Sequence, residues 1–411
     1  MLVALRHRNF RLLWIGLAIS FSGTFMQQAA LLWHVSLLVE PDRRGFALGL
    51  VGLVRVVPII LFSMIAGVAA DVFDRRKLML ITQLGGAIVA SALSALAFAG
   101  VETVWPIYAL AAIGAGVGSF DPPARQALVP MLVPREHLPN AINLNTTMVM
   151  GASVAGPAIG GTVIAIGGVG WAYAVNAISF LFVVVALLMM RDVPATDKSA
   201  AHARDSMSLA AAKDGLRFVF GSPMIRSTML VDFFATFFAS AMALLPIYAQ
   251  DILHVGAKGY GILAAAPAVG AVLGSTTMLV MSHRIGRQGR VLVWAVVAYG
   301  ISTIVFGFSH IFWITFACLA ASGAADSVSM VIRNLIRNLE TPDAMRGRMV
   351  GVNMIFFMGG PQLGELEAGM VAQAFGAPAS VVSGGIACVL ATSLIARYTP
   401  ELWRYTTQQT T

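Results

Sequence analysis

Residues 191–222 read RDVPATDKSAAHARDSMSLAAAKDGLRFVFGS and form the longest polar stretch of the chain. Outward from it in both directions, long apolar runs alternate with short polar gaps, six runs on each side. A helix needs about 20 apolar residues to cross a bilayer core, so these runs predict an all-α membrane protein with twelve transmembrane helices. The expected spans are 11–39, 46–70, 78–99, 105–121, 141–165, 171–190, 226–249, 259–281, 291–309, 311–332, 349–372 and 377–396.

The composition of the chain supports the same reading. Of the 411 residues, 58% are hydrophobic and only 11% are charged, whereas soluble domains carry roughly 25% charged residues. The formal net charge of +8 does not indicate nucleic-acid binding, because the basic residues lie in the gaps between apolar runs rather than in one patch. We therefore expect the lipid bilayer, and no nucleic acid, as the surroundings of this protein.

The basic residues also predict the orientation. If the N-terminus is cytoplasmic, 23 of the 27 Lys and Arg residues fall on the cytoplasmic side, 3 fall on the other side, and Arg55 lies within a span. Cytoplasmic loops are enriched in Lys and Arg. Both termini are thus expected in the cytoplasm.

The two sets of six spans form a predicted internal repeat. Three residue pairs recur at an offset of 208 positions: Arg125 and Arg333, Pro134 and Pro342, Asn145 and Asn353. Two parallel repeats of this kind imply a pseudo-two-fold axis along the membrane normal and a rocking motion about a cavity between the halves. The expected parts are an N-terminal half (1–190), a cytoplasmic linker (191–224), a C-terminal half (225–397) and a cytoplasmic tail (398–411); residues 208–220 of the linker read either as a short surface helix or as part of a tether.

Two motifs connect the sequence with a known family. After the second predicted helix, Gly67, Asp71, Arg75 and Arg76 match a pattern of Gly, three residues, Asp, a basic residue, any residue, Gly and two basic residues, while Val72 and Asp74 depart from it. The fifth predicted helix contains the run GPAIGG, with Gly156, Pro157, Gly160 and Gly161. With the loop segment 121–130, these residues resemble the major facilitator superfamily over essentially the whole chain, and within it the bacterial drug–proton antiporter branch that includes the enterobactin exporter.

The resemblance implies a secondary transporter in the bacterial cytoplasmic membrane, with a gating role for both motifs. The cations after the second helix, Arg75, Arg76 and Lys77, equally fit simple anchoring on the cytoplasmic side. The glycines and the proline of the fifth helix equally fit close helix packing. The basic residue of the family's fourth helix has no counterpart between Trp105 and Phe120.

Charged side chains inside predicted spans are candidate coupling groups, because a charge in a bilayer is costly and usually functional or paired. Arg55 lies about 14 Å into the second helix at 1.5 Å per residue, and Asp232 lies in the seventh. Asp232 reads as a proton-coupling acid or as half of an interhelical salt bridge, with Arg55 as a possible partner or anion-binding group. Secondary intramembrane acids are Asp121, Asp326, Glu365 and Glu367.

The first helix carries three further polar residues at depth, Gln27, Gln28 and His34. They fit either the lining of a cargo cavity or hydrogen bonding between helices.

The leading hypothesis is proton-coupled export of small amphipathic organic molecules, drug-like compounds or siderophores, by alternating access. Import of a small organic solute is the alternative of the same class; a membrane receptor or a membrane-embedded enzyme is the alternative of another class. The sequence shows no metal, nucleotide or catalytic motif, so we expect no enzyme activity and no cofactor, with the proton gradient as the energy source. The chain is expected to function as a monomer with a small-molecule cargo.

Overall fold

The computed structural model describes residues 2–191, 209–281 and 285–406, and within these ranges it consists of helices without strands. The side chain of Asp71 lies outside this description. The residues separate into two compact units. The first unit comprises Met1–Val39, Val54–Asp205 and Gly256–Ala265, and the second comprises Glu40–Leu53, Ser206–Val255 and Ala266–Thr411. The division of the chain into the four parts expected from the sequence stays a prediction.

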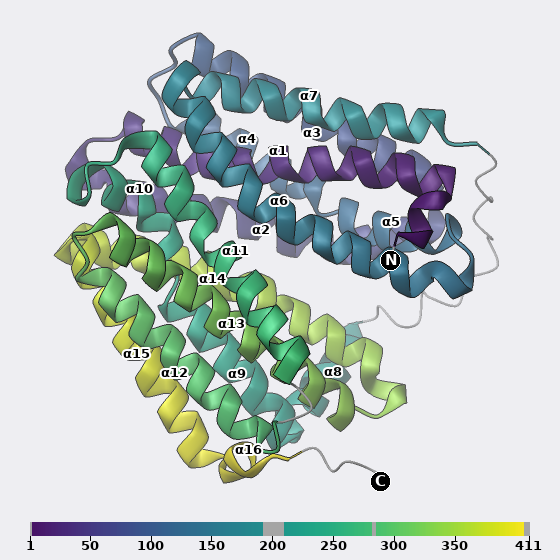
Figure 1. Ribbon diagram of the computed structural model, residues 1–411, viewed down its shortest axis with the longest axis vertical. Helices are drawn as coiled ribbons and strands as arrows, with labels where there is room; N and C mark the ends of the chain where they lie inside the picture. The colour runs from purple at the N-terminus through teal and green to yellow at the C-terminus, as the bar shows by residue number, and fades with distance from the viewer. Residues whose placement is uncertain (1, 192–208, 282–284, 407–411) are drawn as a thin grey trace. The chain divides into compact units, whose positions relative to one another are not determined.

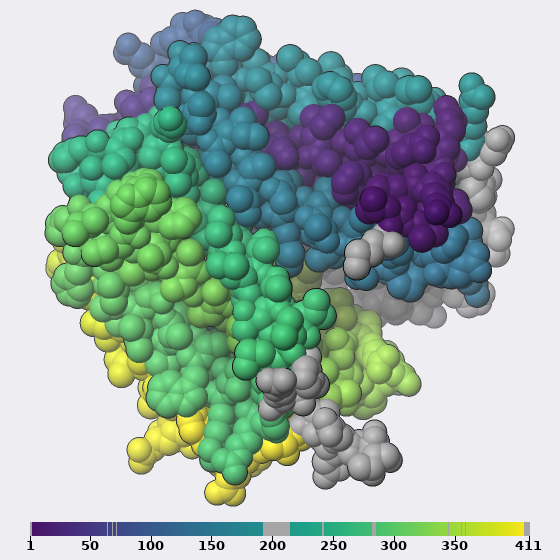
Figure 2. Space-filling model, viewed as in Figure 1, coloured from purple at the N-terminus to yellow at the C-terminus, as the bar shows by residue number. Residues whose placement is uncertain are grey.

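The first unit is a bundle in which α1, α3 and α7 pack side by side (Figure 1). Helix α1 also packs against α6, and Figure 2 shows the purple start of the chain lying against the blue residues of α6. Its buried apolar core includes Phe10, Leu13 and Leu17 of α1. The helices that contribute to this unit are α1 (Arg8–Leu38), α2 (Arg44–Val72), α3 (Arg75–Phe98), α4 (Trp105–Gly118), α5 (Asp121–Leu128), α6 (Leu138–Gly167) and α7 (Val169–Met189).

The second unit is built around α12, which packs against both α13 and α15, while α9 packs against α14 and α15 (Figure 1). Val231, Leu292 and Ile332 lie in its buried apolar core. Its helices are α8 (Leu209–Gly221), α9 (Pro223–Phe238), α10 (Leu245–Ile247), α11 (Gly256–Met281), α12 (Gln288–Gly307), α13 (Phe312–Glu340), α14 (Arg346–Phe375), α15 (Ala377–Tyr398) and α16 (Pro400–Arg404). Helices α2 and α11 each contribute one segment to either unit.

The length and hydropathy of the helices confirm an all-α membrane protein. Ten helical segments of the described chain are long and apolar enough to cross a membrane. Of the other two expected spans, α4 has 14 residues, about 21 Å of helix. In α14 the apolar run is interrupted by Asn353, Gln362 and Glu365.

The seventh expected span, 226–249, is not one continuous α-helix. Helix α9 ends at Phe238, and the chain continues through a 3-10 turn at Ala241–Leu244, the short α10 and a π-helical turn at Tyr248–Ile252. Pro246 accounts for the 3-10 turn, because its ring clashes with the carbonyl of residue i−4, here Met242, and it has no N–H to donate; the end of α9 at Phe238 lies before that contact. The expected helix is therefore interrupted before the proline.

The end of the linker is helical, since α8 covers Leu209–Gly221; residues 192–208 lie outside the described residues. Leu216 and Phe220 are 40% and 47% exposed, whereas Val219 is buried, and a methyl group at Gly215 would touch the backbone of Arg348. The face of α8 that packs against α14 is thus the one bearing Gly215 and Val219.

Candidate functional site

Four charged side chains form one cluster inside the second unit. Arg333 lies on α13 and places its Nη2 atom 2.9 Å from Asp232 Oδ1 on α9. The same nitrogen lies 3.3 Å from Asp326 Oδ1, two turns earlier on α13. Arg337 Nη2 lies 3.4 Å from Asp232 Oδ2. The cluster therefore holds two guanidinium groups and two carboxylates, with Asp232 contacted by both arginines.

The four groups differ sharply in burial. The side chains of Asp232, Arg333 and Arg337 are at most 4% exposed, whereas that of Asp326 is 44% exposed. Arg337 also donates from Nε to the backbone oxygen of Arg333. Three guanidinium nitrogens, Nε and Nη1 of Arg333 and Nη1 of Arg337, are buried without a hydrogen-bond partner among the described residues. Burying a charge is costly unless it is paired and hydrogen-bonded. Neutralising one of these buried groups would therefore leave its partner as an unpaired buried charge.

Sequence reasoning identified Asp232 and Asp326 but assigned Arg333 and Arg337 to the cytoplasmic loops. The structure places both arginines inside the unit, on the last three turns of α13. The signal that distinguishes them is spacing, because Asp326, Arg333 and Arg337 follow one another at i, i+7 and i+11 and so share one helix face.

Asp326 also lines a cavity of about 120 Å³ within the second unit. Helix α12 contributes Tyr299, Ser302 and Thr303 to its wall, and α13 contributes Ser322. Met242, Phe306 and Leu319 supply an apolar part of the wall. The cavity therefore joins a half-exposed carboxylate to hydroxyl groups and to apolar side chains.

The first unit contains a second polar network around Asp121. Gln83 on α3 donates from Nε2 to Asp121 Oδ1 at 2.8 Å, and Arg125 Nε lies 3.6 Å from Asp121 Oδ2. The Arg125 guanidinium also lies over the ring of Phe21, 4.5 Å from its centre. Asp121 is thus held by its own unit through a hydrogen bond and an ion pair.

The polar residues of α1 fall into different surroundings. Gln27 accepts a 2.7 Å hydrogen bond from Asn176 Nδ2 on α7. His34 is buried, with Nδ1 3.2 Å from the hydroxyl of Tyr173, whereas Gln28 is exposed. Gln27 and His34 therefore connect α1 to α7.

The cations after α2 contact helix ends of their own unit. Arg75 donates to the carbonyl oxygen of Ala127 at 3.3 Å and contacts the sulfur of Met131. Arg76 donates to the carbonyl oxygen of Leu188. Asp74, which stands where the family pattern has Gly, caps α3 by accepting from the backbone N–H of Lys77. Gly67 lies in α2.

The glycines of the fifth predicted helix lie in α6, with Pro157 inside the helix. A Cβ atom at Gly156 would lie 2.6 Å from the carbonyl oxygen of Ser22 on α1, and Gly160 faces Met26 of the same helix. At Gly161 a Cβ would lie 2.6 Å from the carbonyl oxygen of Ala257 at the start of α11. The small residues thus allow α6 to approach two helices closely, whether or not they also permit bending.

Two intramembrane candidates lie on other helices, α2 and α14. Arg55 is partly buried in the part of α2 that belongs to the first unit. Glu365 is partly buried in α14, where a methyl group at Gly52 would touch its carboxylate. The partners of Asp232 are the two arginines of α13.

Sequence comparison identifies the family. The family described as transmembrane secretion effector matches residues 1–409. The enterobactin exporter EntS of Citrobacter koseri is 27% identical over 342 residues, which cover 83% of this chain and 80% of that protein. EntS of Escherichia coli O1:K1 has the same identity and coverage.

Structural comparison gives the same fold. A bacterial homologue of the human lysosomal transporter Spinster, in an inward-facing conformation, has a TM-score of 0.74 at 15% identity and covers 97% of this chain and 99% of its own. The D-xylose–proton symporter has a TM-score of 0.69 at 15% identity, with 96% of this chain and 99% of its own covered. These relatives are transporters rather than enzymes, and the chain belongs to the transmembrane secretion effector family of the major facilitator superfamily.

Proposed function

We propose that this transporter couples the inward flow of protons to the export of small amphipathic organic molecules, and that Asp326 is the residue that binds the proton. Drug-like compounds and siderophores are the proposed cargo, in line with the exporters that are 27% identical. The protein is proposed to act as a monomer in the bacterial cytoplasmic membrane with both termini in the cytoplasm. The observation that carries the proposal is the contact of a half-exposed acid, Asp326, with Arg333, whose buried neighbours are Asp232 and Arg337.

The charges of the cluster favour Asp326 over Asp232 as the proton acceptor. Protonating Asp232 would leave Arg333 and Arg337 in a buried place without the carboxylate that both contact, and breaking a buried pair costs about 3–5 kcal/mol. Protonating Asp326 leaves Asp232 with both of its partners. Asp326 is also the member that a cavity can supply with water or ligand.

Proton coupling at this site provides enough energy for accumulation. One elementary charge that moves through the whole membrane field contributes about 2.3 kcal/mol per 100 mV. About 1.4 kcal/mol corresponds to a tenfold concentration ratio. One proton per cargo molecule can therefore support a substantial gradient.

The test uses everted membrane vesicles that contain the protein and are energised with a respiratory substrate. Accumulation of a panel of fluorescent amphipathic dyes and of a catechol siderophore is measured with and without a protonophore. We expect protonophore-sensitive accumulation in the unchanged chain and its loss in Asp326→Asn. The matched control is Glu367→Gln, which changes an acid on a different helix, α14, and should retain accumulation.

Two outcomes would count against the proposal. Accumulation that persists in Asp326→Asn and still collapses with protonophore would place the coupling acid elsewhere. Uptake into right-side-out vesicles, without accumulation in everted ones, would indicate import instead of export.

A further inference from the structure

The cavity beside Asp326 adjoins a groove on the outside of the second unit. The groove lies between α12 and α13, has a volume of about 460 Å³, and is lined by Ile301, Val305, Trp313, Ile314, Ala317 and Ala321 together with Ser302 and Cys318. Ser302 and Cys318 line both the groove and the cavity. An apolar surface hollow and a polar internal cavity are thus separated by two small side chains.

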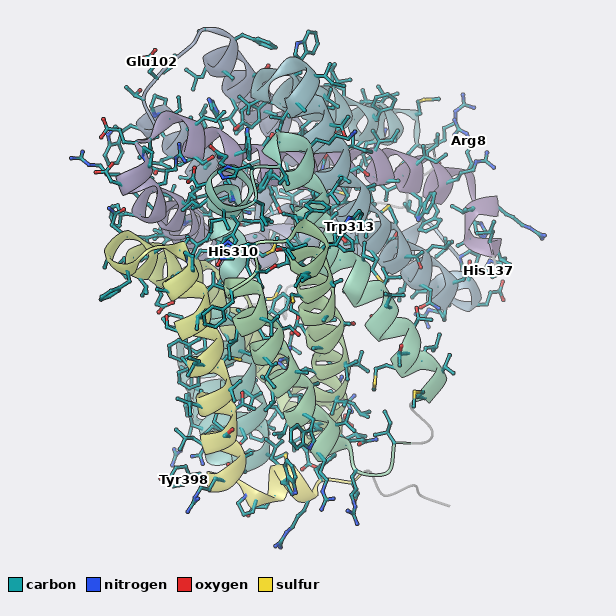
Figure 3. The ribbon with its side chains drawn as sticks, turned by 60° about the vertical axis from the view of Figure 1, so that its left-hand side comes forward. Arg8, Glu102, His137, His310, Trp313 and Tyr398 are labelled. Carbon is teal, nitrogen blue, oxygen red and sulfur yellow. The ribbon has the colours of Figure 1, made fainter. Side chains whose placement is uncertain are left out.

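The groove lies near one end of the helices of this unit. Figure 3 places His310 and Trp313 at that end and Tyr398 at the opposite end. The side chains of Ile301, Val305 and Trp313 are exposed on the surface of the unit. In a membrane-spanning helix pair such a surface faces the hydrocarbon of the lipid, so the groove is a place for an apolar chain.

The hydroxyl groups of the cavity present acceptors to its interior. Tyr299 donates its hydroxyl hydrogen to the carbonyl oxygen of Ala239, Thr303 donates to that of Tyr299, and Ser322 donates to that of Leu319. A hydroxyl has one donor and two acceptor lone pairs. Because these three donors are used on the backbone, with Ser302 as the other hydroxyl of the wall, the remaining lone pairs and the Asp326 carboxylate favour a ligand that donates hydrogen bonds.

The charge of the neighbouring cluster selects a neutral donor. Two guanidinium groups face two carboxylates, so the ionised cluster has no net charge. An ammonium head would add a third positive charge beside Arg333, and an anionic head would oppose the carboxylate. An uncharged hydroxyl, phenol or amide donates without upsetting this balance.

The size of the cavity limits how much of a ligand it can hold. A volume of 120 Å³ corresponds to about four water molecules at about 30 Å³ each. Cys318 and Asp326 are eight residues apart on α13, a rise of about 12 Å. A head group can therefore reach Asp326 only if the rest of the molecule lies along the apolar wall and in the outer groove.

We propose that the groove and cavity form a lateral port between α12 and α13, through which an amphiphile with an apolar tail and an uncharged hydrogen-bond-donating head passes between the bilayer and Asp326. The tail lies in the groove and the head donates to Asp326 past Ser302 and Cys318. The inference rests on the proposed export function, because it names the class of cargo and a route by which that cargo passes between the coupling acid and the lipid.

The test measures how fast N-ethylmaleimide labels Cys318 in protein reconstituted into lipid nanodiscs, with the labelled peptide quantified by mass spectrometry. Hexadecanol and hexadecyl methyl ether are the two probes, since they share a tail and differ in the donor hydrogen. Hexadecanol is expected to slow labelling at concentrations about tenfold below those at which the ether does, the factor that corresponds to one net hydrogen bond. Equal protection by both probes, or protection by neither, would overturn the port.

Two variants test where the tail lies. Ala317→Phe fills the groove and should raise the hexadecanol concentration for half-protection about tenfold, which corresponds to losing roughly two buried methylene groups. Ser393→Phe adds the same side chain to an exposed position of α15 and should leave that concentration unchanged. Equal effects of the two variants would refute the groove as the tail site.

Labelling also separates this inference from the proposed function, because it is measured on protein that is not energised. If hexadecanol protects Cys318 but the vesicles show no proton-driven accumulation, the lateral port is supported and the proposal of proton-coupled export is refuted. If accumulation depends on Asp326 while hexadecanol and its ether behave alike, the export function stands and the port fails.

Discussion

Replacing Asp232 with Asn should destabilise the second unit more than any other single change in the charge cluster. The substitution keeps the shape of the side chain but leaves Arg333 and Arg337, both at most 4% exposed, with Asp326 as the remaining acid of the cluster. Removing one partner of a buried ion pair costs about 3–5 kcal/mol. Asp326→Asn removes a carboxylate that is 44% exposed and leaves Asp232 in contact with both arginines, so it should cost less than Asp232→Asn.

The free energy of unfolding would be measured by denaturant titration of the purified protein in detergent micelles. A double-mutant cycle adds Arg337→Met, which removes the unbalanced positive charge. In the Asp232→Asn background the second change should recover stability, with a coupling free energy of about 0.5–3 kcal/mol. In the unchanged background Arg337→Met should be destabilising.

Two results would refute this reasoning. Equal costs for Asp232→Asn and Asp326→Asn would mean that burial does not separate the two acids. A coupling free energy near zero would mean that Arg337 does not interact with Asp232, despite the 3.4 Å separation of their side-chain atoms.

Two further substitutions test the packing of the first unit. Gly156→Ala should lower the thermal stability, because its Cβ would meet the backbone of α1 and overpacking costs about 1–3 kcal/mol. Gly151→Ala, which has open space in the same helix, should instead raise the stability by about 0.5–1 kcal/mol. Equal melting temperatures for the two variants would contradict the close approach of α6 to α1. Phe21→Leu should lower the free energy of unfolding by about 0.5–2 kcal/mol more than the lost apolar area explains, because it removes the ring beneath the Arg125 guanidinium. If Phe21→Leu is equally destabilising in a chain that also carries Arg125→Met, the interaction between the ring and Arg125 is excluded.

The helices of this chain could largely be predicted from hydrophobicity, because a span must satisfy its backbone internally and must be apolar over its length. The interruption between Phe238 and Leu245 was not predicted. The residues there, Ala239 to Leu244, are as apolar as those of a continuous span. Pro246 explains the 3-10 turn directly before it, an effect that a hydropathy pattern does not register, whereas no residue of the sequence marks the end of α9 at Phe238.

The acids of the candidate site could be predicted, but their partners could not. A carboxylate within an apolar run stands out, and this identified both Asp232 and Asp326. Arg333 and Arg337 follow the same run at the end that was expected to be cytoplasmic, where basic residues are common, so their position alone suggested loops. Both arginines are buried inside the unit because α13 continues past the apolar run to Glu340.

From the sequence, Asp232 ranked above Asp326 as the coupling acid, but this rank depends on what surrounds each of them in the folded unit. Asp232 is contacted by two guanidinium groups, and Asp326 by one, beside a cavity. These differences arise from the packing of α9 against α12 and α13, which follow α9 in the chain only after α10 and α11.

Substrate-linked proton flux in reconstituted liposomes tests the central claim most directly. A pH-sensitive dye inside the vesicles reports proton movement when a transported cargo is supplied on one side, and exchange of labelled for unlabelled cargo is followed in parallel. We predict that the unchanged protein moves protons with cargo, and that Asp326→Asn keeps cargo exchange but moves no protons. Cargo-dependent proton flux in Asp326→Asn that equals that of the unchanged protein would contradict the account.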